Sequence, residues 1–289
     1  MVIVEMDYRS VTAPVGIVRL VEIFLSCVTF SLVAHDGTFS GSYGIWCMFS
    51  WCFCFILTVL IVLLEFTGLC QKIPISWEDF TSAFAMLATL MVLTASIIYP
   101  VEFLKNCSGN NCSFKIAATA MSCLCFIAYA VEVGLTRAKP GEISGFLSTI
   151  PGLLKVLEAF VACIIFISIS DYSRNSGRQW CMAVYCLCFI FALIIIIFTI
   201  CKIISLFPFS FDKVLTGYNI LAVLMYASAA IVWPIFCFDK KYGGGPRPPN
   251  CNSCSWDGLV VVTVMTYVNL VVFIVDTVYS VRLVFFTSP

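Results

Sequence analysis

The sequence predicts an all-α integral membrane protein whose eight transmembrane helices form two parallel-oriented four-helix bundles. Three observations predict this fold class: the composition, eight long apolar segments and an internal repeat. Of the 289 residues, 61% are hydrophobic and only 11% are charged, whereas about 25% of the residues in a soluble domain are charged. A soluble fold of this length could not bury so much apolar surface. Equal numbers of acidic and basic residues give zero net charge, so nucleic acid is not expected as a partner.

The apolar segments define the predicted elements. A transmembrane helix needs about 20 consecutive, mostly apolar residues. Eight segments meet this requirement, at roughly residues 15–35, 44–64, 80–101, 116–136, 151–170, 181–204, 215–236 and 258–281. The chain then divides into a cytoplasmic N-terminal tail at 1–14, a first bundle at 15–136, a cytoplasmic linker at 137–150, a second bundle at 151–284 and a short C-terminal tail at 285–289.

The orientation follows from charge and from cysteine placement. Eight spans put both termini on one side of the membrane, and that side carries nine Lys and Arg residues against seven on the other. Cytoplasmic loops are enriched in Lys and Arg, so this small excess favours cytoplasmic termini. Disulfides persist in oxidising compartments. The two longest loops on the other side hold five cysteines, which also favours cytoplasmic termini: Cys107, Cys112, Cys237, Cys251 and Cys254.

An internal repeat divides the chain into two copies of a four-helix unit. The stretch GIVRLVE at 16–22 aligns with GLLKVLE at 152–158, and both read Gly-x-x-(Arg/Lys)-x-x-Glu. The tripeptide WCM occurs at 46–48 and 180–182, and Tyr99-Pro100 corresponds to Trp233-Pro234. Because each copy has an even number of spans, both copies are expected to lie the same way up, unlike the inverted repeats of many transporters.

Charged residues inside the spans are candidate functional residues, because ionised groups are costly in a bilayer. Arg19 and Glu22 are three residues apart, so they share a helix face. We expect Arg19 to meet Glu132 near the inner end of the first bundle. The second copy offers Lys155, Glu158 and Asp276 at equivalent places, and we expect Lys155 to meet Asp276. The alternative is a proton or ion relay, which would need polar residues that continue across the membrane midplane.

The cysteines have several possible roles. Structural disulfides in the outer loops are expected among Cys107, Cys112, Cys251 and Cys254. The alternative is a redox dithiol at Cys251-x-x-Cys254, and Cys237 could pair with Cys47, with Cys181 or with neither. No histidines cluster with these thiols, so a metal site is not expected. Cys70 and Cys201 lie at inner helix ends and are candidates for palmitoylation.

The architecture resembles that of MARVEL-domain proteins, which have four spans, cytoplasmic termini and an outer cysteine pair between helices three and four. Two such units in one chain resemble the myeloid-associated differentiation marker family. The residues that carry the resemblance are the two Gly-x-x-(Arg/Lys)-x-x-Glu stretches, the two WCM tripeptides and the YP and WP pairs. It implies a non-enzymatic role in cholesterol-rich microdomains, vesicle trafficking, cell contact and motility, with no catalytic, cofactor-binding or metal-binding residues.

The leading functional hypothesis is therefore a membrane-organising protein of the plasma membrane and vesicles. Its expected partners are membrane lipids, with cholesterol as one candidate, and lateral membrane proteins. Aromatic residues form 15% of the chain and offer rigid faces for sterol packing. A small-molecule transporter or channel is the alternative function, and an outer-face thiol oxidoreductase ranks third.

Overall fold

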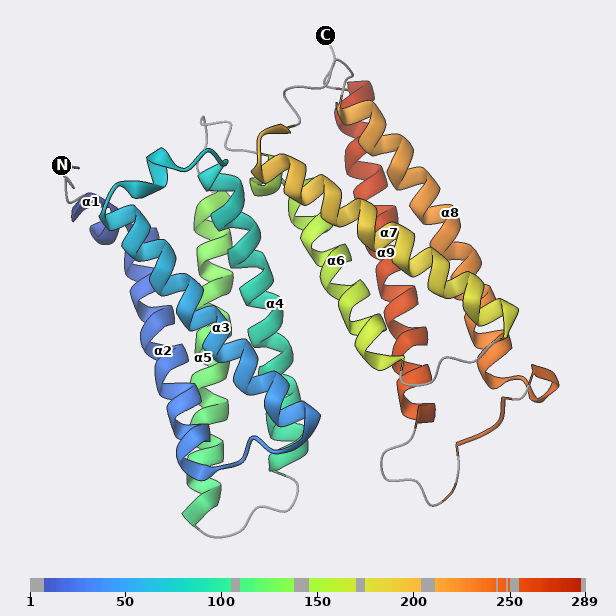
Figure 1. The fold of residues 1–289 in the computed structure, drawn as a ribbon, viewed down its shortest axis with the longest axis horizontal. Helices are drawn as coiled ribbons and strands as arrows, with labels where there is room; N and C mark the ends of the chain where they lie inside the picture. Colours follow the sequence, from blue (N-terminus) through green and yellow to red (C-terminus); the bar gives the residue numbers. More distant parts are fainter. Residues whose placement is uncertain are drawn as a thin grey trace. The chain divides into compact units, whose positions relative to one another are not determined.

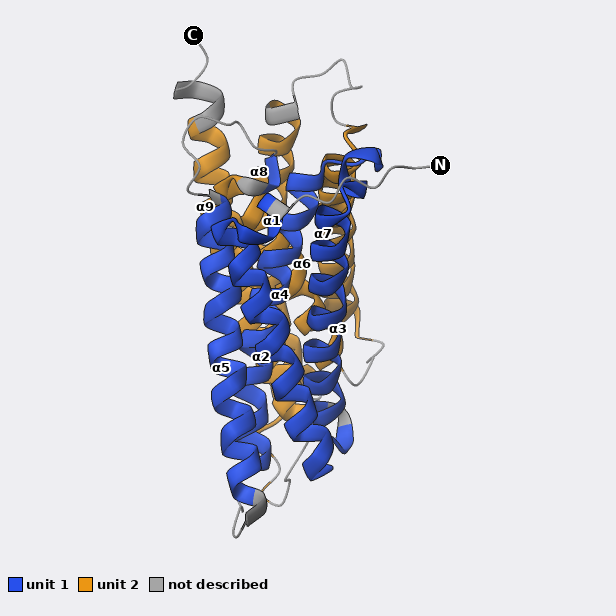
Figure 2. Cartoon of the chain, turned by 90° about the vertical axis from the view of Figure 1, so that its left-hand side faces the viewer, with its two compact units in different colours: residues 1–148 blue, residues 149–289 orange. Residues whose placement is uncertain are grey.

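The computed structural model describes residues 8–104, 110–137, 146–169, 175–203, 211–242, 244–247, 249 and 255–286. Within these ranges all regular structure is helical. Eight helices are long and apolar enough to cross a membrane, which confirms the predicted all-α membrane fold. The chain divides into two compact units, residues 1–148 and 149–289 (Figure 2).

Unit 1 is a ring of four antiparallel helices. Each helix packs on the next, and the first packs on the fourth, which closes the ring (Figure 1). The elements are α1 (Tyr8–Thr12), α2 (Pro14–Asp36), α3 (Gly41–Phe66), the 3-10 turn η1 (Leu69–Lys72), α4 (Trp77–Phe103), α5 (Asn110–Arg137) and the 3-10 turn η2 (Phe146–Ser148).

Unit 2 repeats this arrangement, with α6 packed on α7, α7 on α8, α8 on α9, and α9 back on α6. Its elements are α6 (Ile150–Ser168), α7 (Ser176–Ile200), α8 (Phe211–Phe238), the 3-10 turn η4 (Lys240–Tyr242) and α9 (Ser255–Phe286). The two units therefore have the same helix order and the same ring of contacts.

Local sequence explains where several helices begin and end. Pro14 and Pro151 lie in the first turns of α2 and α6, where a proline loses no helical hydrogen bond. Thr149 caps α6 by accepting a bond from the Gly152 N–H at 3.4 Å. At the end of α2, Gly37 takes a left-handed φ of 68°, which glycine adopts without a steric penalty.

Two element boundaries differ from the predicted ones. The sixth span was expected to reach residue 204, but α7 ends at Ile200 because Lys202 has a φ of 57°, which a right-handed helix cannot contain. The predicted N-terminal tail contains the short helix α1. Its Ser10 and Val11 carbonyls approach Gly16 so closely that a Cβ there would overlap them.

The end of the predicted linker docks on unit 1. Leu147 in η2 is fully buried, and its backbone N–H donates to Asp79 Oδ1 at 2.7 Å. The Ser76 hydroxyl donates to the other oxygen of Asp79 at 2.6 Å. Asp79 therefore joins the first turn of α4 to η2, just before α6 begins. Residues 138–145 of the linker lie outside the described residues.

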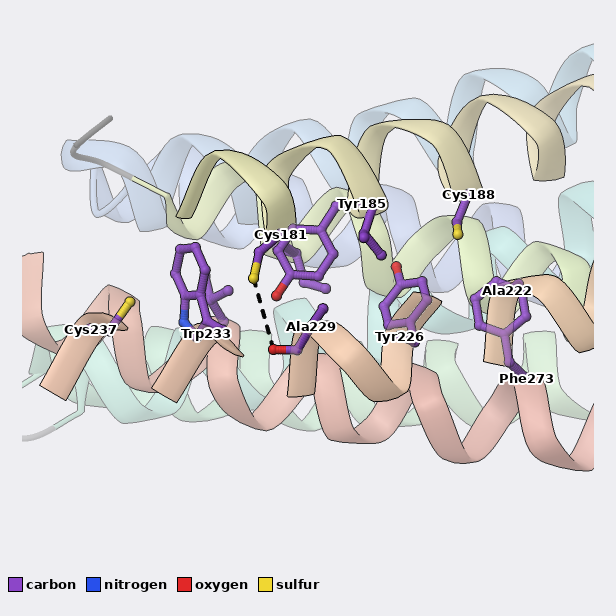
Figure 3. Packing of buried hydrophobic residues seen from close by; sticks show 12 residues of the cluster. Cys181, Tyr185, Cys188, Ala222, Tyr226, Ala229, Trp233, Cys237 and Phe273 are labelled. Atoms are coloured by element: carbon purple, nitrogen blue, oxygen red, sulfur yellow. Dashed lines mark hydrogen bonds between the residues drawn. The ribbon is translucent and has the colours of Figure 1, made fainter. Parts of the chain in front are cut away.

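The apolar cores of the two units repeat the same contacts. Trp51 meets Tyr99 edge-on in unit 1 at 5.5 Å between ring centroids, and Tyr185 meets Trp233 in unit 2 at 6.0 Å (Figure 3). The Cys181 thiol points at the Ala229 carbonyl at 3.9 Å, as Cys47 points at Ala95 in unit 1. Figure 3 shows Tyr185 of α7, Tyr226 of α8 and Phe273 of α9 close together, with tilted ring contacts at 5.7 and 5.0 Å between centroids. The described parts of both interiors are packed with side chains in this way.

Candidate functional site

A buried ionic cluster lies at one end of unit 1, where α2 and α4 begin and α3 and α5 end. Arg19 on α2 is 4% exposed. Its Nε donates to Glu132 Oε1 on α5 at 2.5 Å, and its Nη1 donates to Glu65 Oε2 on α3 at 2.5 Å. Trp77 on α4 donates from its indole to the other Glu65 oxygen at 2.8 Å. Arg19, Glu65, Trp77 and Glu132, here called the Arg19 cluster, thus connect all four helices.

Glu22 departs from the expectation that it shares in ion pairing. Its side chain is fully buried beside the Arg19 cluster, yet neither carboxyl oxygen accepts a hydrogen bond from a donor in the described residues. The guanidinium of Arg19 directs its contacts to Glu132 and to Glu65 instead. Glu65 was not expected in the cluster, and it takes the position as second acid that sequence spacing had assigned to Glu22.

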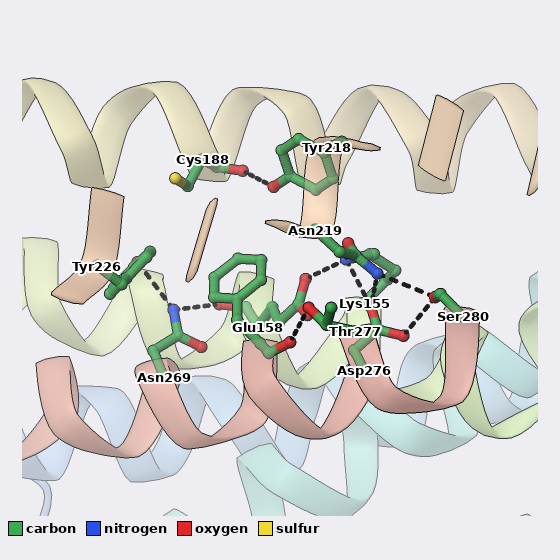
Figure 4. Close-up of polar contacts among 11 residues, drawn as sticks. Lys155, Glu158, Cys188, Tyr218, Asn219, Tyr226, Asn269, Asp276, Thr277 and Ser280 are labelled. Atoms are coloured by element: carbon green, nitrogen blue, oxygen red, sulfur yellow. Dashed lines mark hydrogen bonds and ion pairs between the residues drawn. The ribbon is translucent and has the colours of Figure 1, made fainter. Parts of the chain in front are cut away.

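Unit 2 holds a second cluster at the corresponding end (Figure 4). The Lys155 ammonium on α6 is fully buried. It donates hydrogen bonds to Glu158 Oε2 at 2.7 Å and to Asn219 Oδ1 on α8 at 2.6 Å, and it forms an ion pair with Asp276 Oδ2 on α9 at 2.7 Å. The ammonium is therefore surrounded by three oxygen atoms. Lys155, Glu158, Asn219, Asp276 and Ser280 are here called the Lys155 cluster.

Further contacts hold Asp276 of the Lys155 cluster in place. The Asn219 amide donates to Asp276 Oδ2 and to Ser280 Oγ, both at 3.0 Å. The Lys155 ammonium also lies 4.9 Å from the Tyr218 ring centre and 5.1 Å from that of Phe273, where an aromatic face attracts a cation. A buried charge is tolerated when it is paired and hydrogen-bonded, and Lys155 meets this condition.

The two clusters have their second acid on different helices because α3 and α7 differ at one position. By the repeat offset that aligns Trp46 with Trp180, Glu65 corresponds to Thr199. The Thr199 hydroxyl donates to the Ile195 carbonyl of its own helix and supplies no charge. Lys155 therefore finds its second acid on its own helix, at Glu158, whereas Arg19 finds its second acid on α3.

Polar side chains continue beyond the clusters, paired across helices. In unit 1, α5 bonds to every other helix: Cys125 with Ser26 of α2 at 3.2 Å, Tyr129 with Thr58 of α3 at 2.7 Å, and Ser122 with Ser96 of α4 at 2.7 Å. In unit 2, α9 does the same. Thr266 bonds to Tyr185 of α7, and Asn269 donates to Tyr226 of α8 and to the Glu158 carbonyl of α6. The last helix of each bundle is thus hydrogen-bonded to the other three.

The cysteines fall into three groups. Cys112 is disulfide-bonded, while the other three disulfide candidates, Cys107, Cys251 and Cys254, lie outside the described residues. Cys237 is buried and forms no disulfide, and neither do Cys47 and Cys181, so among the three options left open for Cys237 the structure shows the unpaired one. The palmitoylation candidates lie at helix ends: Cys201 is exposed directly after α7, and Cys70 is half-buried in η1.

Several members of the clusters were missed from the sequence. Glu65 lies one residue beyond the predicted end of the second span, so it is not among the charged residues expected inside the spans. Asn219 and Asn269 lie inside predicted spans, and their amides were the available signal, since polar residues within a membrane usually have a specific partner. Among the described residues no group of three His, Cys, Asp or Glu side chains could hold a metal ion.

Two apolar four-helix bundles, each with its polar groups gathered inside, define a multi-pass membrane protein with a duplicated membrane domain. A family model described as "MARVEL: Membrane-associating domain" matches the chain twice, at residues 10–135 and 146–279. The first match contains the whole Arg19 cluster, and the second contains the Lys155 cluster except Ser280.

Several curated proteins are similar in sequence to this chain over 96% of its length. A myeloid-associated differentiation marker homolog of Xenopus laevis is 50% identical and covers 96% of this chain and 95% of its own length. The human myeloid-associated differentiation marker-like protein 2 is 47% identical, with 96% and 94% covered, and the human myeloid-associated differentiation marker is 46% identical, with 96% and 90% covered. The chain belongs to the myeloid-associated differentiation marker family of tandem MARVEL-domain proteins. No solved structure matches it.

Proposed function

We propose that the protein organises membrane microdomains through lateral contacts with lipids and other membrane proteins, without enzymatic activity. The observation that carries this proposal is the division of side chains in each bundle. Charged residues of the spans bond to one another inside, while large apolar side chains face outward on every long helix, as Phe24, Ile56, Leu224 and Ile231 do with 60–64% of their surface exposed. Such a surface interacts with lipid tails and with other spanning helices.

The comparisons support the membrane part of this proposal. The family model is described as a membrane-associating domain, and the similar proteins carry the name myeloid-associated differentiation marker. The finer parts, which are residence in sterol-rich domains of the plasma membrane and vesicles and binding of cholesterol, rest on the resemblance and on the exposed aromatic residues. On α3, Phe49 stacks on Phe53 with ring centroids 5.5 Å apart, and Trp46 lies tilted against Phe49 at 6.1 Å.

Flotation of membranes from cells that express the full chain tests this proposal. We expect the protein in sterol-rich light fractions and expect it to leave them when cholesterol is extracted. The variant Phe49→Leu keeps the surface apolar but breaks the stack, so it should reduce this enrichment, whereas Ile56→Leu serves as a matched outward-facing control. A protein that stays outside light fractions, with or without cholesterol extraction, would contradict the proposal.

The clusters have a structural role in the proposed function. We infer that the Arg19 and Lys155 clusters close each bundle by joining its first helix to its last. Removing one partner of a buried ion pair leaves an uncompensated charge and costs about 3–5 kcal/mol. A transporter would instead need a path for solute along the bundle axis, and the polar groups described there bond to one another across helices. Solute uptake by vesicles that contain the purified protein would favour the transport alternative.

The outer and inner ends of the bundles carry two proposed modifications. We propose that Cys112 joins Cys107, and that Cys251 joins Cys254 in the second unit, so that each outer loop is held by one disulfide. We also propose that Cys70 and Cys201 are palmitoylated at the inner face, where a second lipid anchor would add to membrane affinity. The exposed thiol of Cys201 is open to an acyltransferase.

A further inference from the structure

A pair of carboxyl groups recurs at the same place in both bundles. In unit 2, Glu158 of α6 and Asp276 of α9 each lie 2.7 Å from the Lys155 ammonium, and in unit 1 Glu22 of α2 is buried on the helix face of Arg19, which pairs with Glu132 of α5. In each pair the first acid lies three residues after the cation of its cluster. All four side chains are 2% exposed or less.

The first acid of each pair has oxygens that no donor reaches. Both oxygens of Glu22 and Oε1 of Glu158 are buried and receive no hydrogen bond from the described residues. An ionised carboxylate can only accept hydrogen bonds, whereas a protonated carboxyl group can also donate one. Two buried acids beside one cation repel each other when both are ionised, and this repulsion is lost when one of them keeps its proton.

Counting charges gives the same result. In unit 2 the Lys155 ammonium faces the two acids Glu158 and Asp276, so the fully ionised cluster has an excess negative charge with no exposed side chain. One proton on the pair makes it neutral. In unit 1 one proton on the Glu22–Glu132 pair balances Arg19. The remaining charge falls on Glu65, whose side chain is 19% exposed and accepts the Trp77 indole N–H.

The other titratable groups that face the pairs supply no second cation. Besides Arg19 and Glu132, the groups that interact with Glu22 are the thiols of Cys54 on α3 and Cys125 on α5 and the phenol of Tyr129 on α5. Besides Lys155 and Asp276, those that interact with Glu158 are Cys188 on α7 and the phenols of Tyr218 and Tyr226 on α8.

We propose that each bundle is a proton-binding site, in which the carboxyl pair Glu22–Glu132 or Glu158–Asp276 holds one proton between its two acids. Glu22 and Glu158 carry the proton, because Glu132 accepts from Arg19 whereas Glu22 accepts from no described donor, and because Asp276 accepts from Asn219 and Ser280 in addition to its ion pair with Lys155. The bound proton lets α2 approach α5, and α6 approach α9, at the point where two acids would otherwise repel.

A hydrophobic carbodiimide is a direct probe for such a group, because it partitions into apolar surroundings and reacts with a protonated carboxyl. The carboxyl proton moves to one carbodiimide nitrogen, and the carboxyl oxygen bonds to the central carbon. Transfer of the acyl group to nitrogen then gives a stable N-acylurea with no leaving group. The purified full chain, in detergent and in lipid nanodiscs, is treated with dicyclohexylcarbodiimide, and its peptides are mapped by mass spectrometry.

We expect adducts at Glu22 and Glu158, and we expect their yield to fall as the pH of the reaction rises. Glu22→Gln should abolish the adduct in unit 1 only, and Glu158→Gln the adduct in unit 2 only, because the partner acid is then ionised against its cation. Glu102→Gln, an exposed acid at the other end of α4, is the matched control and should leave both adducts.

Infrared spectroscopy provides a second measurement that does not depend on access of the probe. The carbonyl band of a protonated carboxylic acid should be present in the wild-type chain and should weaken in each Gln variant but not in Glu102→Gln. Either the site-specific adducts or the site-specific loss of this band supports the proposal. The absence of both, with the variants folded, overturns it.

Discussion

Arg19 and Lys155 each pair with buried acids on neighbouring helices, but their side chains do so with different chemistry. Arg19 spans α5 and α3 through separate nitrogens of one planar guanidinium, a geometry that a lysine cannot reproduce. Lys155 instead sits at the centre of three acceptors and two aromatic faces. Each residue fits the acids around it, and those acids differ because Glu65 has no charged counterpart in α7.

Substituting Arg19 by Lys should therefore destabilise the protein although it keeps the charge. An ammonium at this position can follow Glu132 or Glu65 but cannot hold both at the Arg19 geometry. We expect a loss of about 1.5–3 kcal/mol in the free energy of unfolding, the range for a hydrogen bond to a charged group, which lowers the unfolding temperature of the full chain in detergent. Lys115→Arg is the control, since Lys115 is 3.9 Å from Asp36. An unchanged unfolding temperature in Arg19→Lys would contradict the bridging role.

Removing the Cys201 thiol tests the proposed acylation at the same scale. Cys201→Ser should lose the part of the hydroxylamine-sensitive acyl label that Cys201 carries and keep the part at Cys70, while Cys123→Ser should retain all of it. Both thiols are exposed, but Cys123 lies well inside α5, away from the inner helix ends where acylation is expected. Equal labelling of the wild-type chain and Cys201→Ser would show that Cys201 is not modified.

Sequence reasoning placed the cations correctly within their helices but found only some of their neighbours. The sequence pointed to Arg19, Glu132, Lys155 and Asp276. The Gly-x-x-(Arg/Lys)-x-x-Glu stretch and an acid near the end of the fourth span occur in both copies, so each copy supports the assignment of the equivalent residues in the other. Glu65 and Asn219 have no charged or amide counterpart in the other copy. Their roles depend on which helix end lies beside the cation, and only the fold supplies that information.

At the scale of helices, the last helix of each bundle is hydrogen-bonded to the other three. The Tyr185 hydroxyl and Thr266 are 2.7 Å apart between α7 and α9, and the Trp51 indole donates to Ser122 at 2.9 Å between α3 and α5. These contacts occupy equivalent positions in the repeat and cross each bundle diagonally. They orient the last helix with respect to the helix opposite it.

Tyr185→Phe should weaken this diagonal contact with little change in volume. Hydrogen bonds between membrane helices contribute about 0.6 kcal/mol on average and up to about 2 kcal/mol. We expect a loss in this range in thermal or denaturant unfolding of the full chain. Tyr279→Phe, on an exposed part of α9, is the control. A loss of equal size in both variants would indicate that the Thr266 contact does not orient α9.

Gly16 has a specific role in joining α1 to α2. A methyl group there would overlap the Ser10 and Val11 carbonyls, and a backbone cannot move as easily as a side-chain tip. Gly16→Ala should therefore release α1, which hydrogen exchange would detect as loss of protection at residues 8–12. In Gly134→Ala the new methyl group meets open space, so that helix should be unchanged or slightly stabilised. Full protection of residues 8–12 in Gly16→Ala would contradict this role.

Helix ends were harder to predict than helices. The apolar runs located all eight spanning helices, because the lipid interior requires about 20 apolar residues for each crossing. The end of α7 and the docking of η2 on Asp79 depend on backbone angles and on a single hydrogen bond. Neither of these changes the hydropathy of the segment.

At the scale of the whole molecule, the protein consists of two copies of one bundle. Each copy has its own ring of helices, its own aromatic core and its own ionic cluster, and both match the same membrane-associating domain. The composition and the repeat were sufficient to predict this organisation. The exchange of Arg19, Glu65 and Val92 in unit 1 for Lys155, Thr199 and Tyr226 in unit 2 shows that the copies have since diverged in their interiors.

An even number of spans puts both termini on one side of the membrane, and the placement of basic residues and cysteines predicts that this side is cytoplasmic. Epitope tags at the N- and C-terminus should become accessible to antibody only after the plasma membrane is permeabilised. A tag inserted between Gly245 and Arg247, on the opposite side in this topology, should be accessible in intact cells. Exposure of either terminal tag in intact cells would rule out this topology.

The central claim is that ionic clusters tie the first helix of each bundle to its last. A double-mutant cycle on Lys155→Met and Asp276→Asn measures the interaction free energy of this pair from the unfolding of the full chain. The cycle is carried out in a Glu158→Gln background, which removes the second acid. If the pair joins α6 to α9, each single change costs about 3–5 kcal/mol because it leaves a buried charge uncompensated. The double variant should then be far less destabilised than the sum of the two. Additive losses would contradict the claim, since they would show that Lys155 and Asp276 stabilise the bundle independently of each other.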